Sequence, residues 1–131
     1  MKKIALFFLC TLSMFSCHES IEKRAAREAK EFTEKMCPTP VQNNTRTDSI
    51  TFDEGTRTMN YYYTFVGPAD NEENIKQTED ELIDILRKAI KENVDLKVYK
   101  DAHFNFRYIY HSEKAPKKTL LDATFSDKDY Q

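Results

Sequence analysis

Residues 59–65 have the sequence Met-Asn-Tyr-Tyr-Tyr-Thr-Phe, and residues 105–110 have the sequence Asn-Phe-Arg-Tyr-Ile-Tyr. In both stretches the side chains alternate along the chain, which is the period-two pattern of a β-strand with one buried face. The likeness of the two stretches suggests an internal duplication, although independent selection for strand-forming residues explains it equally well. These two aromatic strands decide the fold, because other elements must cover the face they share.

Each aromatic strand has a predicted partner strand close by in the sequence. Ile50 and Phe52 alternate with Thr51 ahead of the turn residues 53–55, so the first aromatic strand closes a hairpin. After the loop around Pro116, a second alternation over residues 121–125 predicts another hairpin.

Two helices are predicted around these hairpins. Residues 20–36 carry one apolar stripe at helical spacing behind the N-cap candidate Ser20, and Cys37-Pro38 ends the helix. Residues 79–92 form the second helix, where Thr78 and Glu81 have capping-box spacing. Residues 94–102 fit either a strand or a helical turn, and both alternatives stay open.

The predicted fold is therefore α+β, with the order helix, hairpin, helix, hairpin. We expect a four-stranded antiparallel sheet with both helices packed on the face made by the Tyr61 and Phe104 rows. The sheet and second helix should span residues 48–126, and the aromatic rows beneath the helices should be core.

The first 16 residues have the pattern of a signal peptide. Lys2 and Lys3 precede an apolar segment, and the 12 residues from Ile4 to Phe15 reach only about 18 Å as a helix, too short for a bilayer core. The sequence Ser16-Cys17 resembles the lipoprotein signal peptides of bacteria. This resemblance implies cleavage before Cys17, lipid attachment to Cys17 and a single domain over residues 17–131. The alternative is an ordinary thiol at Cys17 after conventional cleavage.

Cys17 and Cys37 cannot form a disulfide if the predicted helix lies between them. The helix ends would be about 24 Å apart, whereas bridged Cα atoms lie within about 7 Å. Cys37 would then be a free cysteine at a helix C-terminus, where the helix dipole raises a thiol pKa. We therefore expect no enzyme activity, and cysteine chemistry at Cys37 is the weakest alternative.

Charge and composition exclude several further functions. Beyond residue 16 the chain has 18 basic and 22 acidic residues, with no basic stripe, so a nucleic-acid partner is not expected. Two glycines are too few for a phosphate-binding loop. His103 and His111 would be about 26 Å apart along one strand, so no metal site and no cofactor are expected.

The sheet face opposite the helices is the predicted interaction surface. If that face is bare, Tyr62, Thr64, Arg107 and Ile109 would form a mixed polar and apolar patch of the kind that partners use.

Residues 37–130 carry a second resemblance. The elements Cys37-Pro38, Arg46 with Asp48, Tyr61 with Tyr63, and a terminal Asp-x-Asp-Tyr are similar to those of small uncharacterised exported proteins of Bacteroidetes-type bacteria. That group implies no activity for this chain. From the residues themselves, we expect Arg46 and Asp48 to form hydrogen bonds that fix the entry into the first strand.

The sequence thus predicts an exported protein, lipid-anchored through Cys17 to the periplasmic face or the outer-membrane surface. It would act without catalysis, as an interaction, structural or inhibitor-like module for another envelope protein. The alternative is a small-molecule or glycan-binding lipoprotein that uses the bare sheet face. The oligomeric state is not predicted.

Overall fold

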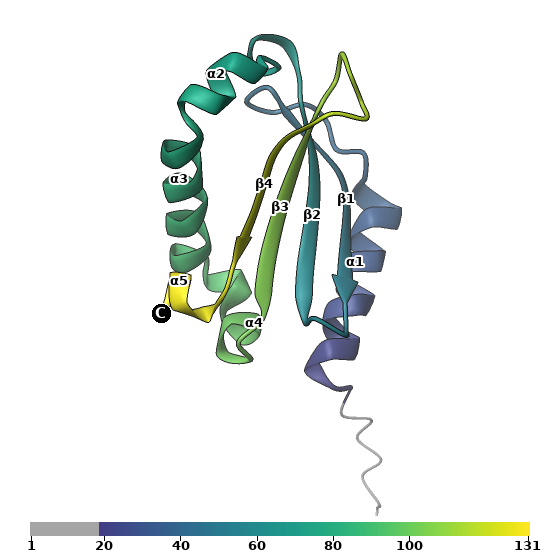
Figure 1. Ribbon diagram of the computed structural model, residues 1–131. Helices are drawn as coiled ribbons and strands as arrows, with labels where there is room; N and C mark the ends of the chain where they lie inside the picture. Colours follow the sequence, from purple (N-terminus) through teal and green to yellow (C-terminus); the bar gives the residue numbers. More distant parts are fainter. Residues whose placement is uncertain (1–18) are drawn as a thin grey trace, which may run out of the picture.

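The computed structural model describes residues 19–131 and has the predicted α+β fold (Figure 1). The signal peptide and Cys17 lie outside the described residues. The strands are β1 (Thr45–Asp53), β2 (Thr58–Phe65), β3 (Asn105–Ser112) and β4 (Thr119–Phe125). The α-helices are α1 (Ile21–Met36), α2 (Glu72–Gln77), α3 (Glu79–Glu92), α4 (Lys97–Asp101) and α5 (Asp127–Tyr130), and the 3₁₀ turns are η1 (Gly67–Ala69) and η2 (Val94–Leu96).

The sheet has the order β1-β2-β3-β4, but it is mixed. The pairs β1–β2 and β3–β4 are the two predicted antiparallel hairpins, whereas β2 and β3 are parallel, with Tyr61 opposite Tyr108. The prediction of a purely antiparallel sheet was therefore wrong. The segment between β2 and β3 contains the long helix α3, which returns the chain to the end where β2 began, so that β3 runs in the same direction.

Helix α1 begins and packs as its sequence predicts. The Ser20 side chain accepts a hydrogen bond from the Lys23 N–H, and Ala25 and Ala29 are buried against the sheet. The Thr33 hydroxyl donates to the Ile50 carbonyl and accepts from the Ile50 N–H, at 2.9 and 2.8 Å. Helix α1 thereby covers the outer edge of β1, where unpaired backbone groups would otherwise be exposed.

The crossover between β2 and β3 lacks the predicted capping box, and it shows which of the two alternatives holds for residues 94–102. Thr78 lies between α2 and α3, and its hydroxyl donates to the Asn74 carbonyl instead of capping α3, so the predicted capping box is absent. Residues 94–102, for which strand and helix were both open, form η2 and α4. The helical conformation is favoured over a strand because it packs Tyr99 into the core while Val94 and Val98 remain exposed.

Helices α1 and α3 pack on the same face of the sheet, as predicted. Helix α1 lies at the β1 margin of that face and α3 at the β4 margin (Figure 1). Helix α1 packs on β1, and α3 packs on β4 and α5. Two buried clusters hold this face together. One, near α4, is centred on Phe104, Phe106 and Phe125, and the other, near α2, contains Phe65, Ile75 and Leu121.

Candidate functional site

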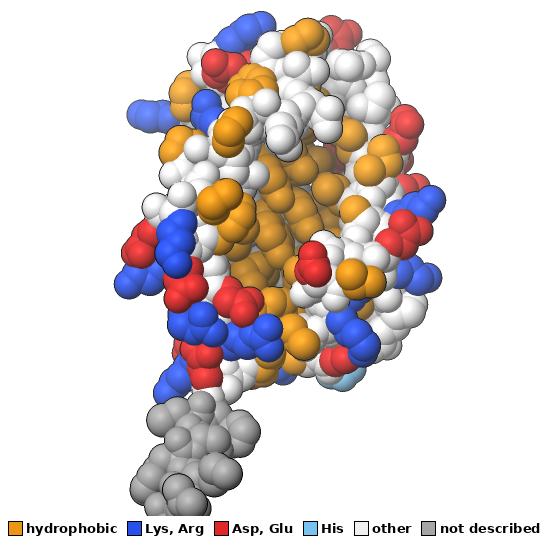
Figure 2. Space-filling model, turned by 180° about the vertical axis from the view of Figure 1, so that it is seen from behind, with side chains coloured by type: hydrophobic (Ala, Val, Ile, Leu, Met, Phe, Trp, Pro, Cys, Tyr) orange, Lys and Arg blue, Asp and Glu red, His pale blue; other side chains and the backbone are white. Residues whose placement is uncertain are grey.

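The candidate site is a groove on the helix-covered face of the sheet, between α1 and α3. Figure 2 shows this face as a hollow whose floor is hydrophobic and whose margins carry charged side chains. The floor is formed by the central strands β2 and β3. Four of its side chains are only partly buried, namely Tyr61, Tyr63, Tyr108 and Tyr110.

The four floor tyrosines form a continuous stack because β2 and β3 are parallel and in register. The ring centroids of Tyr61 and Tyr108, and those of Tyr63 and Tyr110, are 4.8 Å apart. Phe65 extends the stack, with its ring centroid 4.5 Å from that of Tyr110. Stacked aromatic rings with small offsets stabilise one another beyond their burial, so the floor is a preformed surface.

Apolar side chains stand exposed at both margins of the groove. On α1, Phe32 is 37% exposed and Met36 is 56% exposed, and on α3, Ile85 is 56% exposed. Ile85 also lines a cavity of about 380 Å³ at the end of the groove near α2, together with Phe65, Leu82, Leu86, Tyr110 and Leu121. Large apolar side chains left exposed around one hollow are typical of a protein-binding site.

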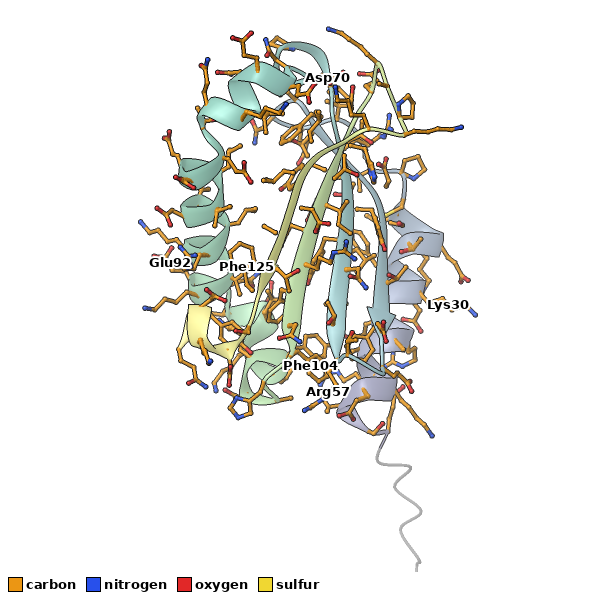
Figure 3. All side chains as sticks on the ribbon, viewed as in Figure 1. Lys30, Arg57, Asp70, Glu92, Phe104 and Phe125 are labelled. Atoms are coloured by element: carbon orange, nitrogen blue, oxygen red, sulfur yellow. The ribbon has the colours of Figure 1, made fainter. Side chains whose placement is uncertain are left out.

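The opposite end of the groove is closed. The Tyr99 hydroxyl of α4 donates a hydrogen bond to the Glu28 carboxylate of α1, and this contact joins the two helices. Burial, together with this hydrogen bond, raises the pKa of Tyr99. Below it lies Phe104, whose ring stacks on Phe52 and faces the Arg57 guanidinium (Figure 3).

The predicted interaction surface lies on the opposite sheet face, and the structure brings its four residues together there. Arg107 forms a two-pronged ion pair with Asp122 at 2.9 and 2.7 Å, whereas Thr64 and Ile109 are buried among their neighbours. Tyr62 and Arg107 border an open, mainly polar depression of about 710 Å³. This face is a shallow surface, and it lacks the enclosed shape of a small-molecule pocket.

Arg46 and Asp48 lie at the start of β1, where the strand register shifts between Thr47 and Ser49. Arg46 Nε donates to Asp48 Oδ1 at 2.8 Å, and the Thr64 hydroxyl of β2 donates to the other Asp48 oxygen. The pair thus ties the beginning of β1 to the end of β2. A structural role of this kind matches the arrangement, while a ligand role for these residues has no support from these contacts.

Cys37 is a partly buried free cysteine directly after α1. Burial, with the nearby Asp48 carboxylate adding to it, raises the pKa of the Cys37 thiol. A reactive cysteine needs the opposite shift, towards the thiolate. Over residues 19–131, the Cys37 sulfur has no hydrogen-bond partner that could act as a base.

His103 and His111 lie near different ends of β3. His103 precedes β3 and pairs with Asp127 at 3.2 Å, while His111 lies near the far end of β3. Within the described part of the chain, no three His, Cys, Asp or Glu side chains are placed to hold a metal ion. None of the helices described is both long enough and apolar enough to cross a membrane.

A family model matches residues 20–121 of the sequence. The chain belongs to the DUF8479 family, a domain of unknown function. The match spans α1, the crossover and most of the sheet, so the groove lies within the DUF8479 domain. No curated protein matches this DUF8479 chain in sequence.

Solved structures share the fold of this DUF8479 chain at low sequence identity. A presumed secreted protein from Pseudomonas aeruginosa is similar with a TM-score of 0.71 and 12% identity, covering 84% of this chain and 92% of that one. The type II secretion system pilotin AspS from Vibrio cholerae has a TM-score of 0.59 and 12% identity, covering 82% and 90%. The pilotin EpsS of the Vibrio vulnificus type 2 secretion system has a TM-score of 0.55 and 10% identity, covering 84% and 91%. These likenesses establish a common α+β fold.

The sequence prediction placed the interaction surface on one face and missed the groove on the other. It treated the floor tyrosines as core. They are partly buried, and Tyr61, Tyr108 and Tyr110 do pack against the buried clusters, but they also line a hollow. The choice of tyrosine instead of phenylalanine at the floor positions could have indicated the groove from the sequence. Four positions near the middle of the strands carry tyrosine, a residue that favours sites with one apolar and one wet end, while the fully buried positions nearby carry Phe104, Phe106 and Phe125.

Proposed function

We propose that this chain is an exported, lipid-anchored protein of the cell envelope that binds a helical segment of another envelope protein in the groove between α1 and α3. The leader pattern supports export, and Cys17 is the proposed lipid attachment site. The observation that carries the binding role is the tyrosine floor left open between the two helices. Fold likeness to pilotins favours a partner related to secretion, but one fold hosts many functions, so the proposal rests on the groove.

The width of the groove favours a helix as the occupant. Strands lie about 4.8 Å apart, so the axes of β1 and β4 are about 14 Å apart, and α1 and α3 pack near these two outer strands. Neighbouring helices in proteins pack about 8–10 Å apart, and a helix with its side chains is about 10–12 Å wide. A helix seated between α1 and α3 needs about 16–20 Å between their axes, which is more than the spacing of the outer strands. We infer that it fits over β2 and β3 because α1 and α3 lie toward the outer margins of the sheet (Figure 1). Binding an amphipathic helix in an apolar groove is a recurrent mode of recognition.

The small-molecule or glycan alternative would use the opposite face, around Tyr62 and Arg107. The depression there is open, and the Arg107 guanidinium already pairs with Asp122. The groove offers a partner exposed apolar side chains to bury, so we favour it.

Site-specific photocrosslinking in the native envelope tests the binding role. A photoreactive amino acid is placed at Phe32 or Ile85 in the groove, and at Tyr62 on the opposite face as the matched control. We expect both groove positions to crosslink to the same segment of one protein, mapped by mass spectrometry to a helix, and Tyr62 to give no such product. Crosslinks from Tyr62 alone would assign the function to the other face.

The anchor is tested separately by the intact mass of the purified protein and by a Cys17→Ala variant. The mature chain should begin at Cys17 and carry the mass of its acyl chains. The variant should lose its membrane association. An N-terminus elsewhere, or an unmodified Cys17, would contradict the lipoprotein assignment.

A further inference from the structure

The tyrosine hydroxyl groups of the groove floor form no hydrogen bonds within the described residues. Tyr61, Tyr63, Tyr108 and Tyr110 form no hydrogen bond through their hydroxyls to any of the described residues, 19–131. Over the same residues, Arg57 Nε is the only buried side-chain nitrogen or oxygen that lacks a partner, so each of the four hydroxyls is at least partly accessible to solvent. The floor is thus an apolar stack of rings that presents four hydrogen-bonding groups to whatever lies above it.

These hydroxyls are donors over the whole physiological pH range. Burial of the rings raises the pKa of Tyr110 to about 12 and raises the pKa values of the other three phenols as well. A helix that covers the floor removes water from all four groups. A buried polar group without a partner destabilises a complex, so a purely apolar helix would bind this floor poorly.

We propose that the groove selects a helix whose floor-facing stripe carries uncharged hydrogen-bonding side chains, namely Ser, Thr, Asn or Gln, flanked by large apolar residues. This inference rests on the proposed function and specifies the chemistry of its partner. The apolar residues match Phe32 and Ile85 at the margins and the cavity at the α2 end of the groove. A carboxylate on the stripe fits less well, because Arg24, a cation on the α1 side, is already paired with Glu28.

The charge of the α3 margin adds a second requirement. Lys88 lies three residues from Ile85 on the same side of α3, and Glu81 and Glu92 lie four and seven residues from Ile85 on that side. Both glutamates are exposed, and within residues 19–131 neither forms an ion pair. The two carboxylates outnumber the one ammonium group, so they favour Lys or Arg at the facing positions of the bound helix, with no cation opposite Lys88.

Two synthetic peptides test the inference. Both are 18-residue stapled helices with the same Leu anchors and the same Lys flank, and they differ only on the floor-facing stripe, which is Gln in one and Leu in the other. Binding is measured by fluorescence anisotropy to the mature chain, residues 17–131, carrying Cys17→Ser so that no lipid competes. We expect the Gln peptide to bind at least tenfold more tightly than the Leu peptide.

Matched variants assign the preference to the floor. The double variant Tyr63→Phe with Tyr108→Phe keeps the ring stack and removes two hydroxyls, so the preference for Gln should fall at least fivefold. Tyr62→Phe, on the opposite face, should leave it unchanged. Circular dichroism and denaturation of each variant exclude a folding defect as the cause.

The possible failures are distinguishable. Equal binding of the two peptides, or tighter binding of the Leu peptide, refutes the hydrogen-bonding stripe and leaves the helix-binding groove standing. An unchanged preference in the double Phe variant also refutes the stripe. If neither peptide binds, or if only a fluorescent fatty acid occupies the groove, the proposed function fails together with the inference.

Discussion

Replacing Phe104 by alanine should destabilise the closed end of the groove more than any other single truncation at that end. The side chain is fully buried, at 0% exposure, and its ring stacks on Phe52 at 4.9 Å and on Tyr99 at 5.5 Å. Truncation of a buried Phe costs about 3–5 kcal/mol, and the loss of two aromatic pairs places Phe104 in the upper part of that range, at about 4–5 kcal/mol. Domains of this size are stable by about 5–15 kcal/mol, so the variant loses a large fraction of its stability.

Urea denaturation followed by circular dichroism measures the effect. The midpoint should fall while the denaturant dependence stays the same, since the native state keeps its compactness. Phe32→Ala is the matched control, because it removes the same ring from a position at the groove margin that is 37% exposed. We expect that change to cost less than about 1.5 kcal/mol, as is usual away from a packed core. The reasoning fails if the two variants are equally stable, or if Phe104→Ala costs less than about 2 kcal/mol.

Three further predictions concern side chains outside the groove floor. Asp70→Asn should lower stability at neutral pH, because the carboxylate accepts hydrogen bonds from the Ser112 hydroxyl and the Lys114 N–H, which lower its pKa in the folded state. This contribution to the free energy of unfolding is present above the unfolded-state pKa of Asp70 and disappears as the pH falls through its lowered folded-state pKa. The denaturation curves of variant and wild type should therefore converge in acid. A difference that does not change with pH would contradict this role of the Asp70 carboxylate. Thr33→Val should lower the free energy of unfolding by about 1–3 kcal/mol in thermal or urea unfolding, because both backbone groups of Ile50 lose their partner. The control Thr51→Val, on the same strand as Ile50, should cost less than about 1 kcal/mol. Equal losses would exclude the edge-covering role of Thr33. Arg107→Ala should cost at most about 1 kcal/mol, because its ion pair with Asp122 is exposed to solvent, and it should leave peptide binding in the groove unchanged; weaker binding would implicate the opposite face.

Local patterns in the sequence predicted most elements of the fold. The alternation at residues 59–65 and 105–110 placed β2 and β3, and the apolar stripe behind Ser20 placed α1. The α+β class and the position of both helices on one face were confirmed. These features depend on residues close together in the chain, where periodicity and capping preferences act directly.

The features that the sequence did not predict depend on contacts between distant residues. The direction of β3 relative to β2 depends on the path of the whole crossover, and alternation within each strand carries no information about it. The groove was missed for a related reason. Two helices of the observed lengths can bury the outer strands and still leave Tyr61 and Tyr108 uncovered, because nothing in a helical pattern states how far apart the helices will lie.

The parallel pairing of β2 and β3 also determines when the groove can exist. Each hairpin is local, but the contact between Tyr61 and Tyr108 joins residues about 50 positions apart, and the crossover must fold back before the two strands meet. Either half of the chain alone therefore lacks the complete tyrosine floor. Under the proposed function, the partner helix would meet a complete groove only after both halves of the chain have folded together.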